Sequence, residues 1–305
     1  MKKNNIKIIL IILNILISVF AFGQKKNSIN QILKQLHNPN DPKVIVAAHR
    51  GDWRNYPENS LMAFQSAIDM GVDIIEVDLD ISKDGVVVIM HDQTLDRTTN
   101  AKGKPSDYTL EELRKLKLRN GLGRLTHHQI PTLEEVMNIA KGKVLVNLDK
   151  SFPYYKETYA ILKQTNTLDI GLFKSEEDFA ALKTQYPNLI DSIVYIPVVN
   201  LDKPNAIQII NTYQTQMNPI AFELIFKTDT SSVLKEYDFI KKNGSKIWIN
   251  SLWASLNAGH DDDEAVDKKH PEQSWTWLIE HGATLIQTDR PKELLAYLKK
   301  RKLHR

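Results

Sequence analysis

Short apolar runs alternate with amphipathic stretches along most of the chain. The runs consist almost entirely of apolar residues, which is typical of strands that are buried on both faces of a sheet. The predicted strands are Val44–Ala48, Ile74–Leu79, Val144–Leu148, Ile170–Phe173, Ile193–Val198, Ile220–Leu224, Ile247–Ile249 and Leu285–Gln287. Helical patterns lie between most of them, for example Glu58–Met70, Pro153–Gln164, Glu176–Tyr186, Pro204–Gln216 and Ser231–Lys242.

Eight strand-then-helix units predict an α/β fold of the TIM type, a (β/α)8 barrel. A doubly wound open sheet is the alternative arrangement of the same units. Before the first strand, apolar residues at helical spacing predict a helix over Ile29–Leu36. We therefore divide residues 24–305 into an N-terminal lead-in segment, residues 24–43, and one barrel domain, residues 44–305; residues 1–23 are treated separately below.

The interval between the second and third predicted strands is much longer than the others. Ile81–Met90 has the pattern of a hairpin, with its turn at Lys83-Asp84-Gly85. A short helix is predicted over Thr109–Leu118, with Thr109 as N-cap and Glu112 completing a capping box. We interpret residues 92–130 as a small insertion on the barrel and not as a separate domain.

The start of the chain has the layout of a secretory signal peptide. Three lysines precede the apolar run Ile8–Phe20, and Ala21-Phe22-Gly23 places small residues where a signal peptidase cleaves. We predict a signal peptide at residues 1–23 and a periplasmic or secreted mature protein without stable membrane insertion. A retained membrane anchor is the alternative, although the run is short for a bilayer, which takes roughly 20 residues.

Composition narrows the classes of partner and chemistry. The 305 residues include 40 basic and 37 acidic side chains, and the three lysines of the predicted signal peptide account for the difference. This balance gives no reason to expect nucleic acid as a partner. The chain has no cysteine, which excludes disulfides, thiolate metal sites and a cysteine nucleophile.

Carboxylates gather at the ends of the second and third predicted strands, where the active site of such a barrel lies. Glu76 and Asp78 are two residues apart, so both point to one face of their strand. Asp149 ends the neighbouring strand. Converging carboxylates repel one another unless a cation neutralises them, and oxygen ligands favour Mg²⁺ or Ca²⁺. We predict one divalent cation at these three residues; structural salt bridges are the alternative.

Two histidines and an arginine belong to the same region. His49 ends the first strand and His91 ends the hairpin. Phosphodiester hydrolysis needs one group to deprotonate the attacking hydroxyl and another to protonate the departing alkoxide, and imidazole serves both roles near neutral pH. Arg50 offers a planar, charged fork for a phosphate oxygen. The alternatives are structural histidines and a salt bridge for Arg50.

These residues are part of a longer pattern that resembles the glycerophosphodiester phosphodiesterase family. The resemblance covers most of residues 44–298. The matching segments are His49-Arg50-Gly51, Pro57-Glu58-Asn59-Ser60, Gly71-Val72-Asp73, Glu76-Val77-Asp78-Leu79, Lys83-Asp84-Gly85, His91-Asp92, Arg97-Thr98-Thr99, Ile130-Pro131-Thr132-Leu133, Gly282-Ala283 and Thr288-Asp289-Arg290-Pro291.

The resemblance implies a TIM barrel with catalytic histidines at His49 and His91, an arginine on the phosphate at Arg50, and metal ligands at Glu76 and Asp78. It also implies the reaction, which is hydrolysis of a small-molecule glycerophosphodiester to an alcohol and glycerol 3-phosphate. Two alternatives remain open. One is an enzyme that cleaves lysophospholipids or inositol phosphodiesters, and the other is a non-catalytic phosphodiester-binding protein.

The third strand departs from the family pattern Asn-Ile-Glu-x-Lys. Here the stretch is Asn147-Leu148-Asp149-Lys150-Ser151, so that Asp149 replaces the glutamate and the lysine is displaced by one position. On a strand this displacement would move Lys150 to the other face. Because strand ends bend, we still predict that Lys150 reaches the phosphate.

Later strand ends add candidates for the pocket wall. Glu223 ends the sixth strand and Trp253 follows the seventh, and we predict both as pocket residues. The acidic run His260–Glu264 lacks the glycine and the ligand alternation of a calcium loop. We interpret it as a solvated rim of the active site; a second metal site is the alternative.

Overall fold

The computed structural model of the chain describes residues 29–188 and 190–305. The predicted signal peptide at residues 1–23 lies outside these ranges. Within them, no helix is both long enough and apolar enough to cross a membrane. The predicted lead-in helix is confirmed as α2 (Ile29–Leu36), whose buried residues Ile32 and Leu36 belong to the main hydrophobic core.

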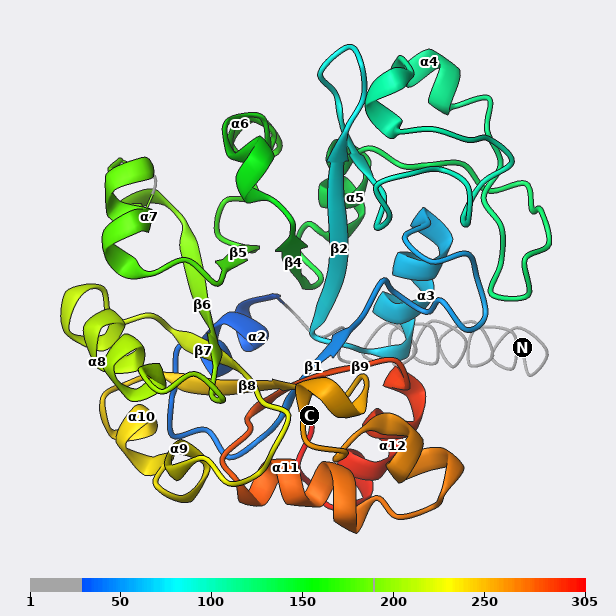
Figure 1. Cartoon of the computed structure of the whole chain (residues 1–305). Helices are drawn as coiled ribbons and strands as arrows, with labels where there is room; N and C mark the ends of the chain where they lie inside the picture. The colour runs from blue at the N-terminus through cyan, green and yellow to red at the C-terminus, as the bar shows by residue number, and fades with distance from the viewer. Residues whose placement is uncertain (1–28, 189) are drawn as a thin grey trace, which may run out of the picture.

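Eight parallel strands close into the predicted barrel (Figure 1). Around the barrel the strands follow one another in chain order, and the last pairs with the first. Their bounds are β1 (Ile45–Ala48), β2 (Ile74–Ile81), β4 (Leu145–Asp149), β5 (Gly171–Ser175), β6 (Val194–Asn200), β7 (Ala221–Ile225), β8 (Lys246–Asn250) and β9 (Leu285–Thr288). All eight predicted strands are therefore confirmed.

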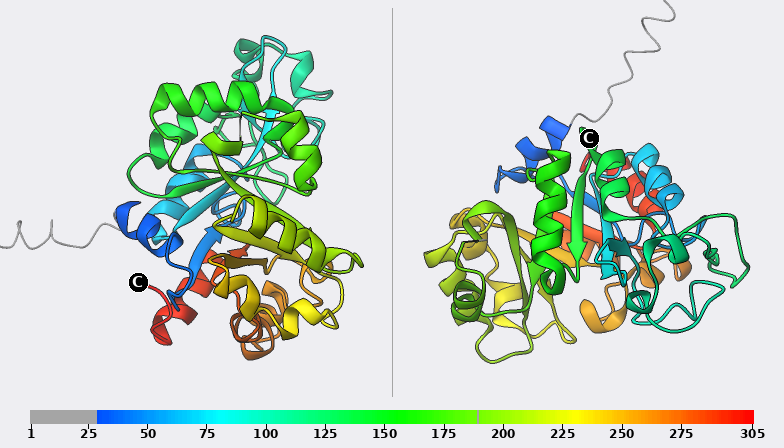
Figure 2. Two further views of the ribbon diagram at one scale, coloured as in Figure 1. Left: turned by 90° about the vertical axis from the view of Figure 1, so that its left-hand side faces the viewer. Right: turned by 90° about the horizontal axis from the view of Figure 1, so that it is seen from above.

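Helices cover the outside of the barrel (Figure 2), which explains why the strands are apolar throughout. They are α3 (Leu61–Met70), α5 (Leu133–Ala140), α6 (Tyr155–Thr165), α7 (Phe179–Gln185), α8 (Ala206–Gln216), α9 (Ser232–Lys235), α10 (Asp238–Lys242), α11 (Trp277–Glu280) and α12 (Pro291–Lys300). The single helix predicted over Ser231–Lys242 is wrong, because the chain forms α9 and α10 instead. Tyr237 lies at the break, and its ring packs so closely on Gly282 that a Cβ there would collide with it.

The hairpin predicted over Ile81–Met90 is confirmed, and it packs against the insertion. β3 (Val87–Ile89) pairs antiparallel with the end of β2 and contributes Val88 to a small separate core with Leu95, Leu113 and Leu118. The Thr109–Glu112 capping box is confirmed, but α4 (Leu110–Leu113) is only one turn long. The predicted extension of this helix to Leu118 is wrong, because Leu118 forms an antiparallel bridge with Thr99 that fixes it in the small core.

The pairing of β2, β4 and β5 brings polar residues together at the carboxyl ends of the strands. Asp78 is the register partner of Asp149. Leu148 is the partner of Phe173, so the next residues along, Asp149 and Lys174, also lie side by side. Because residues in register on parallel strands face the same side of the sheet, the three charged side chains enter the same end of the barrel.

Candidate active site

A cavity of about 400 Å³ opens at the carboxyl ends of the strands. Its walls come from every part of the barrel, with His49 from β1, Glu76 from β2 and Glu223 from β7. All nine residues predicted for the site line it, namely His49, Arg50, Glu76, Asp78, His91, Asp149, Lys150, Glu223 and Trp253. The fold thus brings together residues that are spread over two hundred positions of sequence, in one place where chemistry is feasible.

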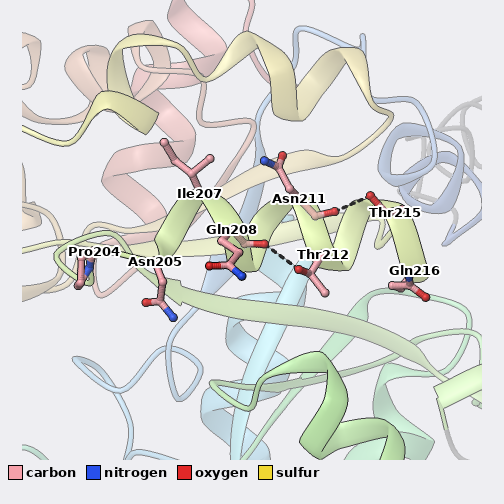
Figure 3. A pocket seen from close by; sticks show the side chains of 8 residues that line it. All are labelled: Pro204, Asn205, Ile207, Gln208, Asn211, Thr212, Thr215 and Gln216. Carbon is pink, nitrogen blue, oxygen red and sulfur yellow. Dashed lines mark hydrogen bonds between the residues drawn. The ribbon is translucent and has the colours of Figure 1, made fainter.

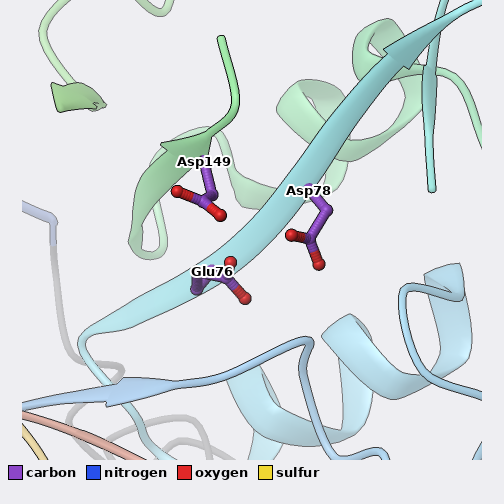
Figure 4. Close-up of side chains that lie close together, drawn as sticks. All are labelled: Glu76, Asp78 and Asp149. Carbon is purple, nitrogen blue, oxygen red and sulfur yellow. The ribbon is translucent and has the colours of Figure 1, made fainter. Parts of the chain in front are cut away.

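Three carboxylates form the floor of this cavity. Glu76 and Asp78 project from the same face of β2, and Asp149 reaches toward them from the end of β4 (Figure 4). One oxygen of each lies within 4.8 Å of the others. Burial and the charge of Asp78 raise the pKa of Glu76 well above its ordinary value. Burial acts on Asp78 in the same direction, but Lys150 and Arg50 outweigh it and hold the pKa of that carboxyl below its ordinary value.

The carboxylate cluster fits a hard divalent cation. Its donor set is all oxygen, which is what Mg²⁺ and Ca²⁺ prefer. Asp78 Oδ1 is buried and accepts no hydrogen bond within the described protein, although it lies close to the Lys150 ammonium. Salt bridges, the alternative interpretation, exist in part, since Asp78 lies 3.2 Å from the Lys150 ammonium and 3.4 Å from Arg50 Nε. Glu76 has no such partner among the ion pairs of the described residues.

His49 is held by an aspartate. Its Nδ1 lies 2.8 Å from Asp289 Oδ1, and the Trp53 indole donates to the same oxygen at 2.6 Å. Asp289 directly follows β9, the strand beside β1, so the pair depends on barrel closure. Burial lowers the pKa of His49, but the charge of Glu76 and the hydrogen bond to Asp289 outweigh it, so the pKa is raised. With Nδ1 engaged, Nε2 is the nitrogen left for proton transfer.

His91 is held in the same way, by the aspartate that follows it in the sequence. Its Nδ1 lies 2.7 Å from Asp92 Oδ1. Arg97 donates to both oxygens of Asp92 and both oxygens of Glu58, over distances of 2.6 to 2.8 Å. These bonds with Arg97, together with His91, lower the pKa of Asp92 against the effect of its partial burial. Arg97 therefore ties the support of His91 to Glu58, which is also the partner of Arg50.

Two cations point at the cavity from positions with a left-handed backbone. Arg50 has φ of 53°, donates its backbone N–H to Glu76 Oε2 at 2.7 Å, and pairs through Nη1 with Glu58 Oε1 at 3.0 Å. Lys150 has φ of 57°, and its ammonium donates to the His91 carbonyl at 2.6 Å. The bend at Lys150 compensates for its displaced position in the sequence and brings it to the cavity.

Glu223 and Trp253 also line the cavity, as predicted from their places at later strand ends. Glu223 is buried and accepts from Asn250 at 2.8 Å and from Lys174 at 3.1 Å. Trp253 is 45% exposed at the rim, with its ring edge-on to the His49 ring at 5.8 Å between centroids. Both are therefore cavity residues, but Glu223 faces a lysine and Trp253 faces a histidine.

Sequence reasoning missed two supports of the site, Lys174 and Asp289. Lys174 directly follows the apolar run Ile170–Phe173, and Asp289 closely follows the run Leu285–Gln287. The rule that polar residues at strand ends belong to the site would have found both.

The interpretation of the acidic run His260–Glu264 as a solvated rim is wrong for Asp262. This carboxylate is buried and accepts four hydrogen bonds, from Ser251, Trp275, Thr288 and the backbone of Asp289. Burial outweighs these bonds and raises its pKa to about 7. Asp262 thus supports the segment that carries Asp289, and its donors leave it no free ligand atom for a second metal.

A larger hollow, of about 710 Å³, lies along the outer side of α8 (Figure 3). Its eight residues run from Pro204 to Gln216, and none of them is titratable. The Thr212 and Thr215 hydroxyls are bonded to carbonyls of their own helix at 2.8 Å. Despite its size, this hollow offers no group for catalysis or metal binding.

An eight-stranded barrel with two histidines and three clustered carboxylates at its mouth has the groups that cleavage of a phosphodiester needs. Similarity to known proteins identifies the family. The chain is 32% identical over 187 residues to the putative glycerophosphodiester phosphodiesterase YhdW of Bacillus subtilis, covering 57% of this chain and 75% of the relative. It is 46% identical over 109 residues to the glycerophosphodiester phosphodiesterase of Caldanaerobacter subterraneus, covering 35% and 45%. The chain belongs to the glycerophosphodiester phosphodiesterase family.

Solved structures agree on the fold. A glycerophosphoryl diester phosphodiesterase from Parabacteroides distasonis superposes with a TM-score of 0.72 at 24% identity, over 90% of this chain and 93% of that one. A phosphodiesterase from Oleispira antarctica, solved in complex with the product sn-glycerol-3-phosphate, gives 0.62 at 22%, over 84% and 97%. A family model described as a domain of unknown function matches residues 195–298. The match to the Caldanaerobacter relative spans less than half of that protein's length.

Proposed function

We propose that this protein hydrolyses glycerophosphodiesters to an alcohol and glycerol 3-phosphate with the help of a divalent cation. Membership of the family supports the reaction class. The observation that carries the proposal is the pair of imidazoles, each held through Nδ1 by a carboxylate, on the wall of one cavity with the carboxylate cluster. A binding protein without activity would have no need of two oriented proton-transfer groups.

The two histidines divide the proton transfers. One imidazole accepts a proton from the attacking water as the water oxygen forms the new bond to phosphorus. The other donates a proton to the leaving alkoxide oxygen as the old P–O bond breaks. Asp289 and Asp92 orient the rings and stabilise the imidazolium form of each. The net change is one water consumed and one ester bond cleaved, with both imidazoles returned to their starting protonation by exchange.

Two cationic side chains in the cavity are the proposed binding groups for the phosphate. Arg50 and Lys150 line the cavity beside the carboxylates and provide donors for the non-bridging oxygens. Mg²⁺ or Ca²⁺ held by Glu76, Asp78 and Asp149 would neutralise the carboxylates and stabilise negative charge on the phosphoryl oxygens. The backbone N–H of Arg50 fixes Glu76 by a 2.7 Å hydrogen bond, which couples the positions of phosphate site and carboxylates.

The test is release of glycerol 3-phosphate from glycerophosphocholine, -ethanolamine, -glycerol and -inositol by the mature protein. Each diester is assayed with chelator, with Mg²⁺ and with Ca²⁺. His49→Ala is compared with His127→Ala, a change at an exposed histidine outside the cavity. We expect metal-dependent turnover that is lost in His49→Ala and kept in His127→Ala. No turnover of any diester with either metal would refute the proposal.

An apolar wall favours a second candidate substrate. Besides its charged and polar groups, the cavity is lined by the apolar residues Phe152, Pro153, Val198, Ile225, Leu252, Trp253 and Leu256. Such a wall suits a leaving group with hydrocarbon surface, as in a lysophospholipid. An assay of choline release from lysophosphatidylcholine tests whether the protein cleaves lysophospholipids. Turnover of the water-soluble diesters alone would exclude it.

We also propose that the enzyme acts after export, on the basis of the predicted signal peptide at residues 1–23. Fractionation of the producing cells and sequencing of the mature N-terminus test this proposal. A chain that begins at Gln24 in the soluble exported fraction is the expected result. An intact N-terminus in the membrane fraction would favour the retained anchor instead.

A further inference from the structure

Lys174 is a lysine inside the carboxylate cluster that neither the reaction nor the family resemblance requires. It lies at the carboxyl end of β5, and its side chain is only 9% exposed. Its ammonium is 3.1 Å from Glu223 Oε2 and 3.6 Å from Asp149 Oδ1. A buried ammonium is costly unless it is paired, so these two contacts explain how Lys174 is tolerated here. One of the two is with a predicted metal ligand.

A chain of hydrogen bonds fixes this lysine from the barrel interior. The Trp248 indole donates to Asn250 Oδ1 at 2.9 Å, and Asn250 Nδ2 donates to Glu223 Oε1 at 2.8 Å. The other oxygen of Glu223 receives Lys174. All of these side chains are buried, which makes the position of the ammonium well defined. Lys174 is therefore a buried residue of the site with a fixed position, unlike a mobile lysine on the surface.

Asp149 has few other partners. Among the ion pairs of the described residues, Lys174 is its only cationic neighbour, whereas Asp78 has both Arg50 and Lys150. The Lys174 ammonium lies within pairing distance of both Asp149 and Glu223. A divalent cation on Asp149 would thus meet a fixed positive charge close by, and the two would repel each other.

We propose that Lys174 is a resident counter-cation that shares Asp149 with the divalent ion. Without the ion, Lys174 neutralises Asp149 and Glu223 and keeps the cluster assembled. With the ion bound, Lys174 lowers the affinity of the site for it by direct repulsion, so the site releases the ion more readily. This inference rests on the proposed metal binding at Glu76, Asp78 and Asp149.

The variants Lys174→Met and Lys174→Arg test the role of this charge. Met keeps most of the unbranched side chain but removes the charge, and Arg keeps the charge. Binding of Ca²⁺ and of Mg²⁺ to chelator-treated protein is measured by calorimetry, and melting temperature is measured with chelator and with metal. We expect at least tenfold tighter binding in Lys174→Met, equal to about 1.4 kcal/mol. The metal-induced rise in melting temperature should also increase, because the chelated variant is less stable. Lys174→Arg should resemble the original protein.

Equal or weaker affinity in Lys174→Met would overturn the inference. If Lys174→Met fails to fold in chelator, Lys174→Gln, which retains a hydrogen-bond donor, replaces it with the same two outcomes. The original protein serves as the reference for the proposed function. If it hydrolyses diesters and binds the ion while Lys174→Met binds the ion no more tightly, only the role of Lys174 falls. If it binds neither Ca²⁺ nor Mg²⁺, the metal-dependent reaction itself falls.

Discussion

Replacing Asp289 by asparagine removes the charge that holds His49 while leaving the shape of the site nearly unchanged. His49 Nδ1 lies 2.8 Å from Asp289 Oδ1, and the histidine is only 7% exposed, so solvent screens the pair weakly. A hydrogen bond to a charged group contributes about 1.5–3 kcal/mol. If this stabilisation belongs to the imidazolium formed in the reaction, its loss slows turnover roughly 10- to 150-fold, since about 1.4 kcal/mol is a factor of ten.

The same bond predicts a shift in the pH dependence of Asp289→Asn. The Asp289 carboxylate is one of the causes that raise the pKa of His49, so its removal lowers that pKa. The limb of the pH–rate profile that depends on protonated His49 therefore moves to lower pH. The assay is kcat and KM against pH for one diester at saturating metal.

Two matched variants separate the charge of Asp289 from its other contacts. Trp53→Phe removes the second donor to Asp289 Oδ1 and leaves the carboxylate in place, so its kcat should fall far less. Asp263→Asn changes an exposed carboxylate in the nearby acidic loop and should leave both kcat and the pH profile unchanged. A kcat within threefold of the original protein and an unmoved pH limb in Asp289→Asn would refute the assignment of Asp289 as the positioning residue of His49.

Further predictions concern the support of the site. In Arg97→Lys, a single ammonium cannot bridge Glu58 and Asp92 as the guanidinium does. We therefore expect kcat to fall about tenfold with a smaller change in KM. An unchanged kcat would contradict the role of Arg97 as a support of His91. Asp262→Asn places an amide N–H against hydrogen-bond donors. In urea titration we expect the free energy of unfolding to fall by about 2 kcal/mol or more. A fall below about 0.5 kcal/mol, the size of surface effects, would contradict the structural role of Asp262. Since burial raises the pKa of Asp262 from 3.8 to about 7, the folded protein holds this proton more tightly than the unfolded chain. The free energy of unfolding should therefore fall as pH rises through this range, and Asp262→Asn should flatten that slope.

The barrel and the first half of the site could be predicted because both depend on local patterns. The strands are short apolar runs, and Glu76 and Asp78 share a face by the two-residue period of a strand. Asp289, in contrast, approaches His49 only because β9 closes the barrel against β1, over a separation of 240 residues. The pairing of Lys174 with Glu223 likewise depends on the registers of several strands, which no local pattern specifies.

Local patterns failed where tertiary contacts override propensity. The sequence over Thr109–Leu118 has a capping box and apolar residues at helical spacing, yet the helix ends after one turn because Leu118 is drawn into the insertion core. Asp262 sits in an acidic run that suggests solvent, yet the surrounding hydroxyl, indole and backbone donors provide it with a buried place. Lys150 was a displaced lysine by sequence, and only its left-handed backbone brings it to the cavity.

The central claim is hydrolysis of a glycerophosphodiester at the phosphorus atom by the histidine pair. Phosphorus NMR of glycerophosphocholine turnover in water enriched in heavy oxygen tests it most directly, because the product and the site of oxygen entry are both visible. We expect glycerol 3-phosphate that carries the heavy oxygen on phosphorus, formed with Mg²⁺ or Ca²⁺, suppressed by chelator and absent in His49→Ala. Phosphocholine as the product, or no product from folded protein with bound metal, would contradict the account.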